Sequence, residues 1–98
     1  MSLLGLTIHE LDAIRSVIAR HHNVQRAIVY GSRAKGTYRH NSDVDIAVDG
    51  DVSPLQAQFI AGDLAELPLP YQFDVVSLRH ITNHALREHI QRVGVVLM

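Results

Sequence analysis

The chain has 98 residues, a length that suits one compact domain and leaves no room for a second, substrate-binding domain. Its composition, 47% hydrophobic and 19% charged, excludes a disordered chain. Nine Lys and Arg against ten Asp and Glu give a formal net charge of -1, so we expect no direct binding to nucleic acid, which requires an excess of positive charge.

Two further features of the composition narrow the class of protein. The sequence has no cysteine, so it forms neither disulfide bonds nor thiolate metal sites. The apolar residues 1–6 lack the basic start of a signal peptide and are too few for a spanning helix. We therefore expect a cytoplasmic protein with a single domain over residues 1–98 and no membrane association.

The first predicted elements are a helix and a strand. Thr7 and Glu10 have the spacing of a capping box, and apolar residues then recur every three or four positions as far as about His22. The expected buried stripe of this helix is Ile8, Leu11, Ile14, Val17 and Ile18. Residues 24–30 end in a short β-branched apolar run, which predicts a central strand covered on both faces.

A short helical turn over 32–35 and a loop over 36–42 lead to a second strand over 43–48. This strand alternates in character, which predicts one core face and one functional face. The core face would carry Val44, Ile46 and Val48, and the other face Asp43, Asp45 and Ala47. Residues 49–51 form a turn.

The second half repeats the pattern of helix and strand. Ser53 and Pro54 predict a helix start, with Gln56 as capping partner and with Leu55, Phe59, Leu64 and Leu67 buried, and Pro68 and Pro70 end this helix. Residues 71–78 predict a third strand with Asp74 in its middle, 82–93 a last helix with the stripe Leu86, Ile90 and Val93, and 95–98 a short strand. The predicted fold is α/β (α+β): a small mixed β-sheet flanked by helices.

The aspartates of these strands predict a metal site. Asp43 and Asp45 project in the same direction, about 7 Å apart along the strand, so both carboxylates can reach one cation. All the candidate ligands are oxygens, which favours magnesium over zinc. If strand 71–78 lies beside strand 43–48, Asp74 adds a third carboxylate, enough for two metal ions that clamp a phosphoryl or nucleotidyl transfer.

The segment between the strands predicts a phosphate-binding turn. Gly31 lets the backbone turn sharply and approach an anion, and Ser32 offers a hydroxyl and an amide ahead of a helix start. Arg33, Lys35 and Arg39 place three cations between this turn and the aspartates. Phosphates bound there would lie over the metal ions.

The order Tyr30-Gly31-Ser32, ten residues, then Asp43-Val44-Asp45-Ile46 resembles the signature of the DNA polymerase beta nucleotidyltransferase superfamily. With Asp74 in a later strand, the whole chain is similar to the minimal nucleotidyltransferases (MNT), which are little more than the catalytic core. The resemblance implies a nucleotidyltransferase-like fold, metal-binding Asp43 and Asp45, and a triphosphate held by Gly31 and Ser32. It also implies that Asp74 completes the cluster and activates or orients the acceptor hydroxyl.

The same resemblance implies the substrates and the partner. ATP is the expected donor, with two Mg²⁺ ions, and a protein hydroxyl the expected acceptor, because the chain is too small to carry an acceptor pocket of its own. Minimal nucleotidyltransferases are typically encoded beside a small helical HEPN-domain protein, in many pairs a ribonuclease toxin. The expected function is that of an antitoxin that adenylylates this partner; the alternative is a catalytically idle binding module that neutralises or assembles with it.

Each candidate residue also has a structural interpretation. Asp43 and Asp45 could form a solvated strand face with Asp49, and Asp74 could pair with Arg79 or face solvent. The basic segment could be an ordinary polar loop. His80, His84 and His89 are interpreted as solvated or partly packed histidines of the last helix rather than metal ligands.

Overall fold

The computed structural model describes residues 4–98; residues 1–3, at the start of the apolar N-terminal segment, lie outside the described part. The helices and strands follow the predicted order, with one 3₁₀ turn, η1, after the third strand. In chain order they are α1 (Ile8–Ala19), β1 (Val24–Tyr30), α2 (Gly31–Lys35), β2 (Val44–Gly50), α3 (Pro54–Ala65), β3 (Phe73–Ser77), η1 (Leu78–His80), α4 (His84–Val93) and β4 (Val95–Val96).

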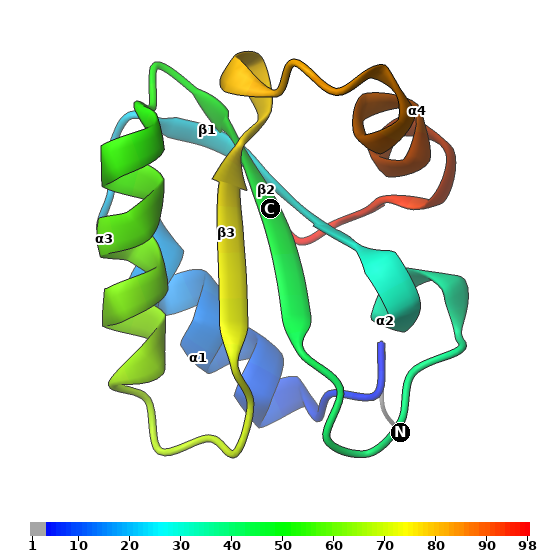
Figure 1. Cartoon of the computed structure of the whole chain (residues 1–98). Helices are drawn as coiled ribbons and strands as arrows, with labels where there is room; N and C mark the ends of the chain where they lie inside the picture. The colour runs from blue at the N-terminus through cyan, green and yellow to red at the C-terminus, as the bar shows by residue number, and fades with distance from the viewer. Residues whose placement is uncertain (1–3) are drawn as a thin grey trace.

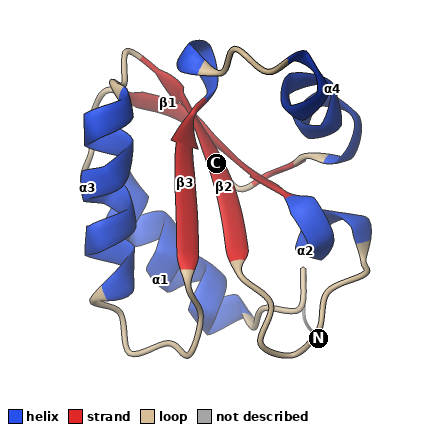
Figure 2. Cartoon of the chain, viewed as in Figure 1, coloured by secondary structure: helices blue, strands red, loops and turns tan. Residues whose placement is uncertain are grey.

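The strands form one mixed sheet in the order β3-β2-β1-β4. β1 pairs antiparallel with both β2 and β4, whereas β2 and β3 run parallel, joined by α3 as the crossover helix. Figure 1 shows α1 and α3 on one side of this sheet and α4 on the other, and Figure 2 shows the same layers by type of structure. The predicted mixed sheet flanked by helices is confirmed, with the 24–30 strand inside the sheet.

The first helix begins as the capping box predicts. The Thr7 hydroxyl accepts from the Glu10 amide at 3.1 Å, and the Glu10 carboxylate accepts from the Thr7 amide at 2.9 Å. The helix ends at Ala19, before His22, and its buried residues are Leu11, Ile14, Val17 and Ile18. Ile8, which was also assigned to the stripe, is 64% exposed because it lies in the first turn, beyond the edge of the core.

The prediction for the buried face of α3 was right at Leu64 and wrong at Leu55 and Phe59. Ser53 caps the helix by accepting from the Gln56 amide at 3.0 Å, as expected. However, Leu55 is 64% exposed and Phe59 61% exposed. The buried residues of the helix are Ala57, Ile60 and Leu64. Apolar residues lie all round this helix, so two stripes are compatible with its sequence, and the stripe with the smaller side chains packs against the sheet.

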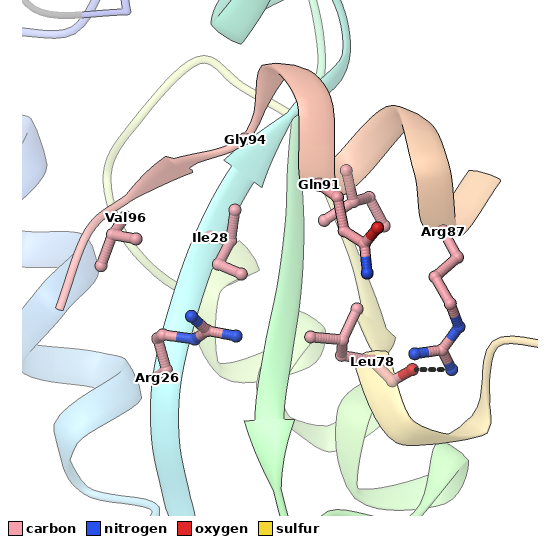
Figure 3. Close-up of a pocket in the computed structure, with 8 residues that line it drawn as sticks. Arg26, Ile28, Leu78, Arg87, Gln91, Gly94 and Val96 are labelled. Carbon is pink, nitrogen blue, oxygen red and sulfur yellow. Dashed lines mark hydrogen bonds between the residues drawn. The ribbon is translucent and has the colours of Figure 1, made fainter. Parts of the chain in front are cut away.

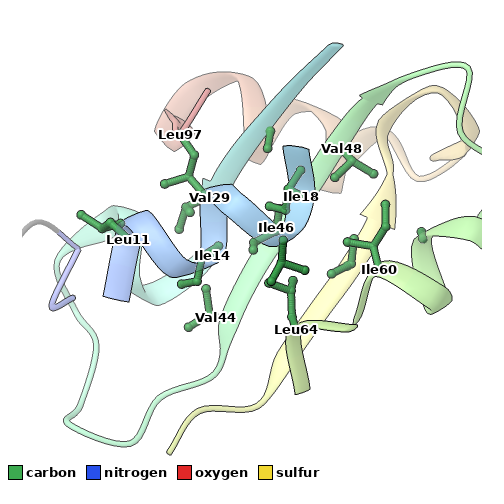
Figure 4. Packing of buried hydrophobic residues seen from close by; sticks show 14 of the residues in the cluster. Leu11, Ile14, Ile18, Val29, Val44, Ile46, Val48, Ile60, Leu64 and Leu97 are labelled. Atoms are coloured by element: carbon green, nitrogen blue, oxygen red, sulfur yellow. The ribbon is translucent and has the colours of Figure 1, made fainter. Parts of the chain in front are cut away.

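The sheet separates two clusters of buried apolar residues. The larger cluster lies between the sheet and helices α1 and α3, and includes Val44, Ile46 and Val48, as the alternation in β2 predicted (Figure 4). The smaller cluster lies under α4 and comprises Ile28, Tyr30, Ala47 and Ile90. Asp45 therefore projects from the face that α4 covers only in part. None of the helices within residues 4–98 has the length and apolar character needed to cross a membrane.

Candidate active site

Two strand aspartates are direct neighbours on the α4 face. Asp45 of β2 pairs in register with Asp74 of β3, and on its other side with Tyr30 of β1. Asp43 directly precedes β2 and is exposed. The strands that carry the predicted carboxylates thus lie side by side with these residues on the same face. Arg79, the alternative partner considered for Asp74, instead forms an ion pair with Asp49 at 3.2 Å.

This arrangement disfavours negative charge at the site. Burial raises the pKa of Asp45, and the charges of Asp74 and Asp43 raise it further, while His89 opposes the shift. Burial, Asp45 and Asp74 together raise the pKa of Tyr30 to about 12, so its hydroxyl stays protonated at neutral pH. A bound cation would relieve the repulsion among the carboxylates.

The donor atoms suit a hard cation such as Mg²⁺, since they are carboxylate oxygens and the sequence has no cysteine. Within residues 4–98, no three His, Asp or Glu side chains are already gathered closely enough to hold one ion together. The adjacent pair of Asp45 and Asp74, with Asp43 at the start of β2, is therefore the donor set that this face offers to a metal ion.

The turn after β1 packs directly against Asp45. Gly31 has a φ of +75°, and a Cβ atom added there would collide with Oδ2 of Asp45. Only glycine combines this left-handed conformation with so close an approach. Gly31 begins α2, and Ser32 follows it, so the turn predicted to bind phosphate lies beside the carboxylates.

His89 of α4 also belongs to this site, which the sequence interpretation missed. Its Nε2 accepts a hydrogen bond from the Gly31 amide at 3.2 Å, and its ring meets that of Tyr30 edge-on, with centroids 6.1 Å apart. The signal was available: His89 lies one turn from Leu86 and Val93 and next to Ile90, so it borders the stripe that faces the sheet. His84 and His80 are exposed, as expected.

Arg33 has a structural role in place of the predicted phosphate contact. Its side chain is 2% exposed, and its guanidinium donates to the carbonyl of Leu4 at 3.0 Å and of Ser42 at 2.8 Å. It also lies over the rings of Tyr71, at 4.7 Å, and Tyr38, at 5.3 Å. Arg33 thus fastens the N-terminal segment and the 36–42 loop to α2.

The other two cations of the basic segment face solvent. Lys35 and Arg39 are exposed. The backbone amide of Arg39 donates to the Ser42 hydroxyl at 2.7 Å, which shapes the loop and leaves the Arg39 side chain outside it. Both side chains remain accessible to a ligand.

Comparison with known proteins points to one family. The sequence profile described as "Polymerase beta, Nucleotidyltransferase" matches residues 12–98. No curated protein sequence matches the chain.

Solved structures share the fold. A toxin-antitoxin crystallised with AMP-PNP is 26% identical, with a TM-score of 0.77 over 90% of this chain and 72% of that one. A tri-AMPylated HEPN toxin in complex with MNT antitoxin from Shewanella oneidensis gives 22% identity and a TM-score of 0.71 over 92% and 70%. The toxin-antitoxin MntA-HepT is 22% identical, with a TM-score of 0.73 over 94% of this chain and 72% of that one. The last two show likeness of fold only.

Proposed function

Because the chain belongs to the polymerase beta nucleotidyltransferase family, we propose that it transfers AMP from ATP to a hydroxyl group on a partner protein. The observation that carries this proposal is the register of Asp45 with Asp74 directly against the Gly31 turn. Carboxylates and a close-approach glycine at one point serve a reaction in which a metal-bound triphosphate must be held in line with an attacking hydroxyl.

In the proposed reaction the acceptor oxygen bonds to the α-phosphorus, the bond from that phosphorus to the β-phosphate oxygen breaks, and pyrophosphate leaves. Asp74 accepts the hydroxyl proton or orients the hydroxyl. The turn formed by Gly31 and Ser32 receives the triphosphate, with the hydroxyl and amide of Ser32 as donors and Lys35 and Arg39 as accessible cations. Arg33 is left out because its donors are used within the fold. Two Mg²⁺ ions held by Asp43, Asp45 and Asp74 would supply charge neutralisation at the transferred group.

His89 has a positioning role in this proposal. It holds the Gly31 amide, which belongs to the turn that would bind phosphate, and it packs against Tyr30 beneath the carboxylates. By accepting from this amide, His89 keeps the turn in place from the side of α4. His89 acts through the turn and need not touch the reacting atoms.

The proposed acceptor is a HEPN-domain partner, which would make this protein the antitoxin of a toxin-antitoxin pair. Support comes from those structural neighbours that are toxin-antitoxin structures, one of them with AMP-PNP and another with a tri-AMPylated HEPN toxin.

The second candidate function is a binding module that neutralises the same partner by contact alone. The exposed Leu55 and Phe59 on α3 give such a module an apolar surface to offer. Against it stands the retained site, since an idle protein gains nothing from like-charged carboxylates on a partly buried strand face.

A double variant separates the two functions. Asp43→Asn with Asp45→Asn should still co-purify with the partner but lose transfer of label from α-labelled ATP. Asp12→Asn with Asp51→Asn removes the same charge from exposed positions outside the site and should transfer normally. If the site variant labels the partner as well as the parent does, the catalytic assignment is wrong; if the parent labels nothing in a verified complex, the binding module is the better account.

A further inference from the structure

A groove of about 250 Å³ lies on the α4 face, away from the carboxylates. Its floor is apolar, formed by Ile28, Leu78 and Ile90, and its rim carries Arg26 and Arg87. Arg26 is four residues before Tyr30 on β1, so it lies about 13 Å from the carboxylate end at about 3.3 Å per residue. The groove and the candidate active site therefore occupy opposite ends of one face.

The rim of the groove has more positive than negative charge. Arg26 and Arg79 share the single carboxylate of Asp49, at 3.5 Å and 3.2 Å. Arg87 forms no ion pair with any residue in the range 4–98. The net charge of the chain is -1, yet this end of the face carries excess positive charge while the opposite end carries the aspartates. The groove thus favours an anionic ligand.

Arg87 is held ready to bind such a ligand. Its Nη2 donates to the carbonyls of Leu78 at 2.9 Å and Ile81 at 3.0 Å, which fixes the guanidinium. The donors on Nε and Nη1 have no partner among the described residues. Figure 3 shows the side-chain ends of Arg26 and Gln91 extending toward Leu78, and the guanidinium of Arg87 at the Leu78 carbonyl on the other side of that residue. A fixed guanidinium loses little conformational entropy when it binds a carboxylate.

The remaining lining disfavours a multiply charged phosphate more than a singly charged carboxylate. Gly94, which follows the last residue of α4, lines the groove, so the negative end of a helix dipole lies there. Among the described residues that line it, none begins an α-helix, although the start of an α-helix is the usual site for a multiply charged phosphate. A singly charged side chain with aliphatic neighbours matches both the arginines and the apolar floor.

We propose that this groove binds an acidic, aliphatic segment of the acceptor protein, with a carboxylate between Arg26 and Arg87 and an apolar side chain over Ile28 and Leu78. That the segment belongs to the acceptor rests on the proposed function. An extended chain covers the distance from the groove to Tyr30 in about four residues. A segment docked here brings a nearby hydroxyl to Asp45 and Asp74.

The test uses an acetylated, amidated hexapeptide of alternating leucine and glutamate, titrated into the nucleotide-free protein and followed by backbone amide NMR. We expect saturable shifts at Ile28, Arg87 and Gly94. Arg26→Glu should weaken binding by about tenfold, since it reverses a charge at the contact. Arg20→Glu, which makes the same change at an exposed position at the end of α1, should leave binding within about twofold.

Three results would overturn the proposal: equal binding of the same peptide with glutamine in place of glutamate, an unchanged affinity in Arg26→Glu, or displacement of the peptide by a lower concentration of tripolyphosphate or single-stranded RNA. The amide spectrum itself verifies that each variant is folded. Arg87 is not substituted, because its carbonyl contacts hold η1 in place. Peptide binding requires no nucleotide transfer, so loss of transfer with binding intact counts against the proposed function alone.

Discussion

Replacing Gly31 with alanine tests the link between the turn and the carboxylates, and the chain offers a matched control. Gly31 and Gly36 have nearly equal φ angles, +75° and +79°. A Cβ atom at Gly36 meets nothing within 4 Å, whereas one at Gly31 collides with Oδ2 of Asp45. The two variants therefore share the backbone strain and differ in the displaced carboxylate.

The strain has a calculable effect on stability. An L-residue in the left-handed region costs about 1–2 kcal/mol. For a domain of this size, about 1 kcal/mol lowers the melting temperature by about 4–8 °C. Gly36→Ala should therefore melt about 4–16 °C lower than the parent, and Gly31→Ala at least as much lower, because Asp45 must also move.

Activity should separate the two variants far more than stability does. A catalytic group misplaced by about 1 Å loses about 100-fold in rate, so Gly31→Ala should transfer AMP at least that much more slowly. Gly36→Ala should remain within about threefold, since its effect is confined to the end of α2.

The assay pairs thermal unfolding with the initial rate of label transfer from α-labelled ATP to the partner, measured well below both melting temperatures. Equal losses of rate in Gly31→Ala and Gly36→Ala would refute the argument, because strain alone would then explain both. So would a parental rate in Gly31→Ala.

Three further predictions concern single side chains. The raised pKa of Asp45 means that the folded state binds the carboxyl proton more tightly than the unfolded chain does, so the stability of the metal-free protein should fall as the pH rises from 3.8, the ordinary pKa, through the raised pKa. Asp45→Asn should remove this dependence of stability on pH and raise the melting temperature measured at neutral pH in EDTA. An unchanged melting curve would contradict the prediction. His89→Ala should speed amide hydrogen exchange at Gly31 and raise KM for ATP more than it lowers kcat. His89→Gln keeps a hydrogen-bond acceptor and should partly restore both the exchange rate and KM. Slow exchange at Gly31 in the alanine variant would show that the contact is dispensable. Arg33→Met should lower the free energy of unfolding by about 3 kcal/mol in urea titrations, because the carbonyls of Leu4 and Ser42 lose a charged donor. A loss below about 1 kcal/mol would argue against the role of Arg33 in fastening these segments to α2.

The parts of the fold that local chemistry determines could be predicted from the sequence. The capping box at Thr7 and the cap at Ser53 specify helix starts through hydrogen bonds over three residues. The alternation in β2 distinguishes its two faces because the period of a strand is fixed. The neighbouring positions of Asp45 and Asp74 followed from the same alternation, together with a single assumption about which strands pair.

The rest depends on tertiary packing, which the sequence pattern leaves open. Apolar residues surround α3, so hydrophobicity could not tell that Ala57 rather than Phe59 faces the sheet. Arg33 looked like part of a basic loop, because nothing local reveals that Leu4 and Tyr71 close around it. His89 reaches the turn only because the chain returns after β3 and lays α4 across the sheet.

The most direct test of the central claim compares two labels of ATP in the purified complex with the partner. Transfer of a nucleotidyl group predicts that label from the α-phosphate stays on the partner protein and that label from the γ-phosphate leaves as pyrophosphate. Retention of the γ-label on the partner would mean phosphoryl transfer, and retention of neither label in an intact complex would mean that these carboxylates do not catalyse the proposed reaction.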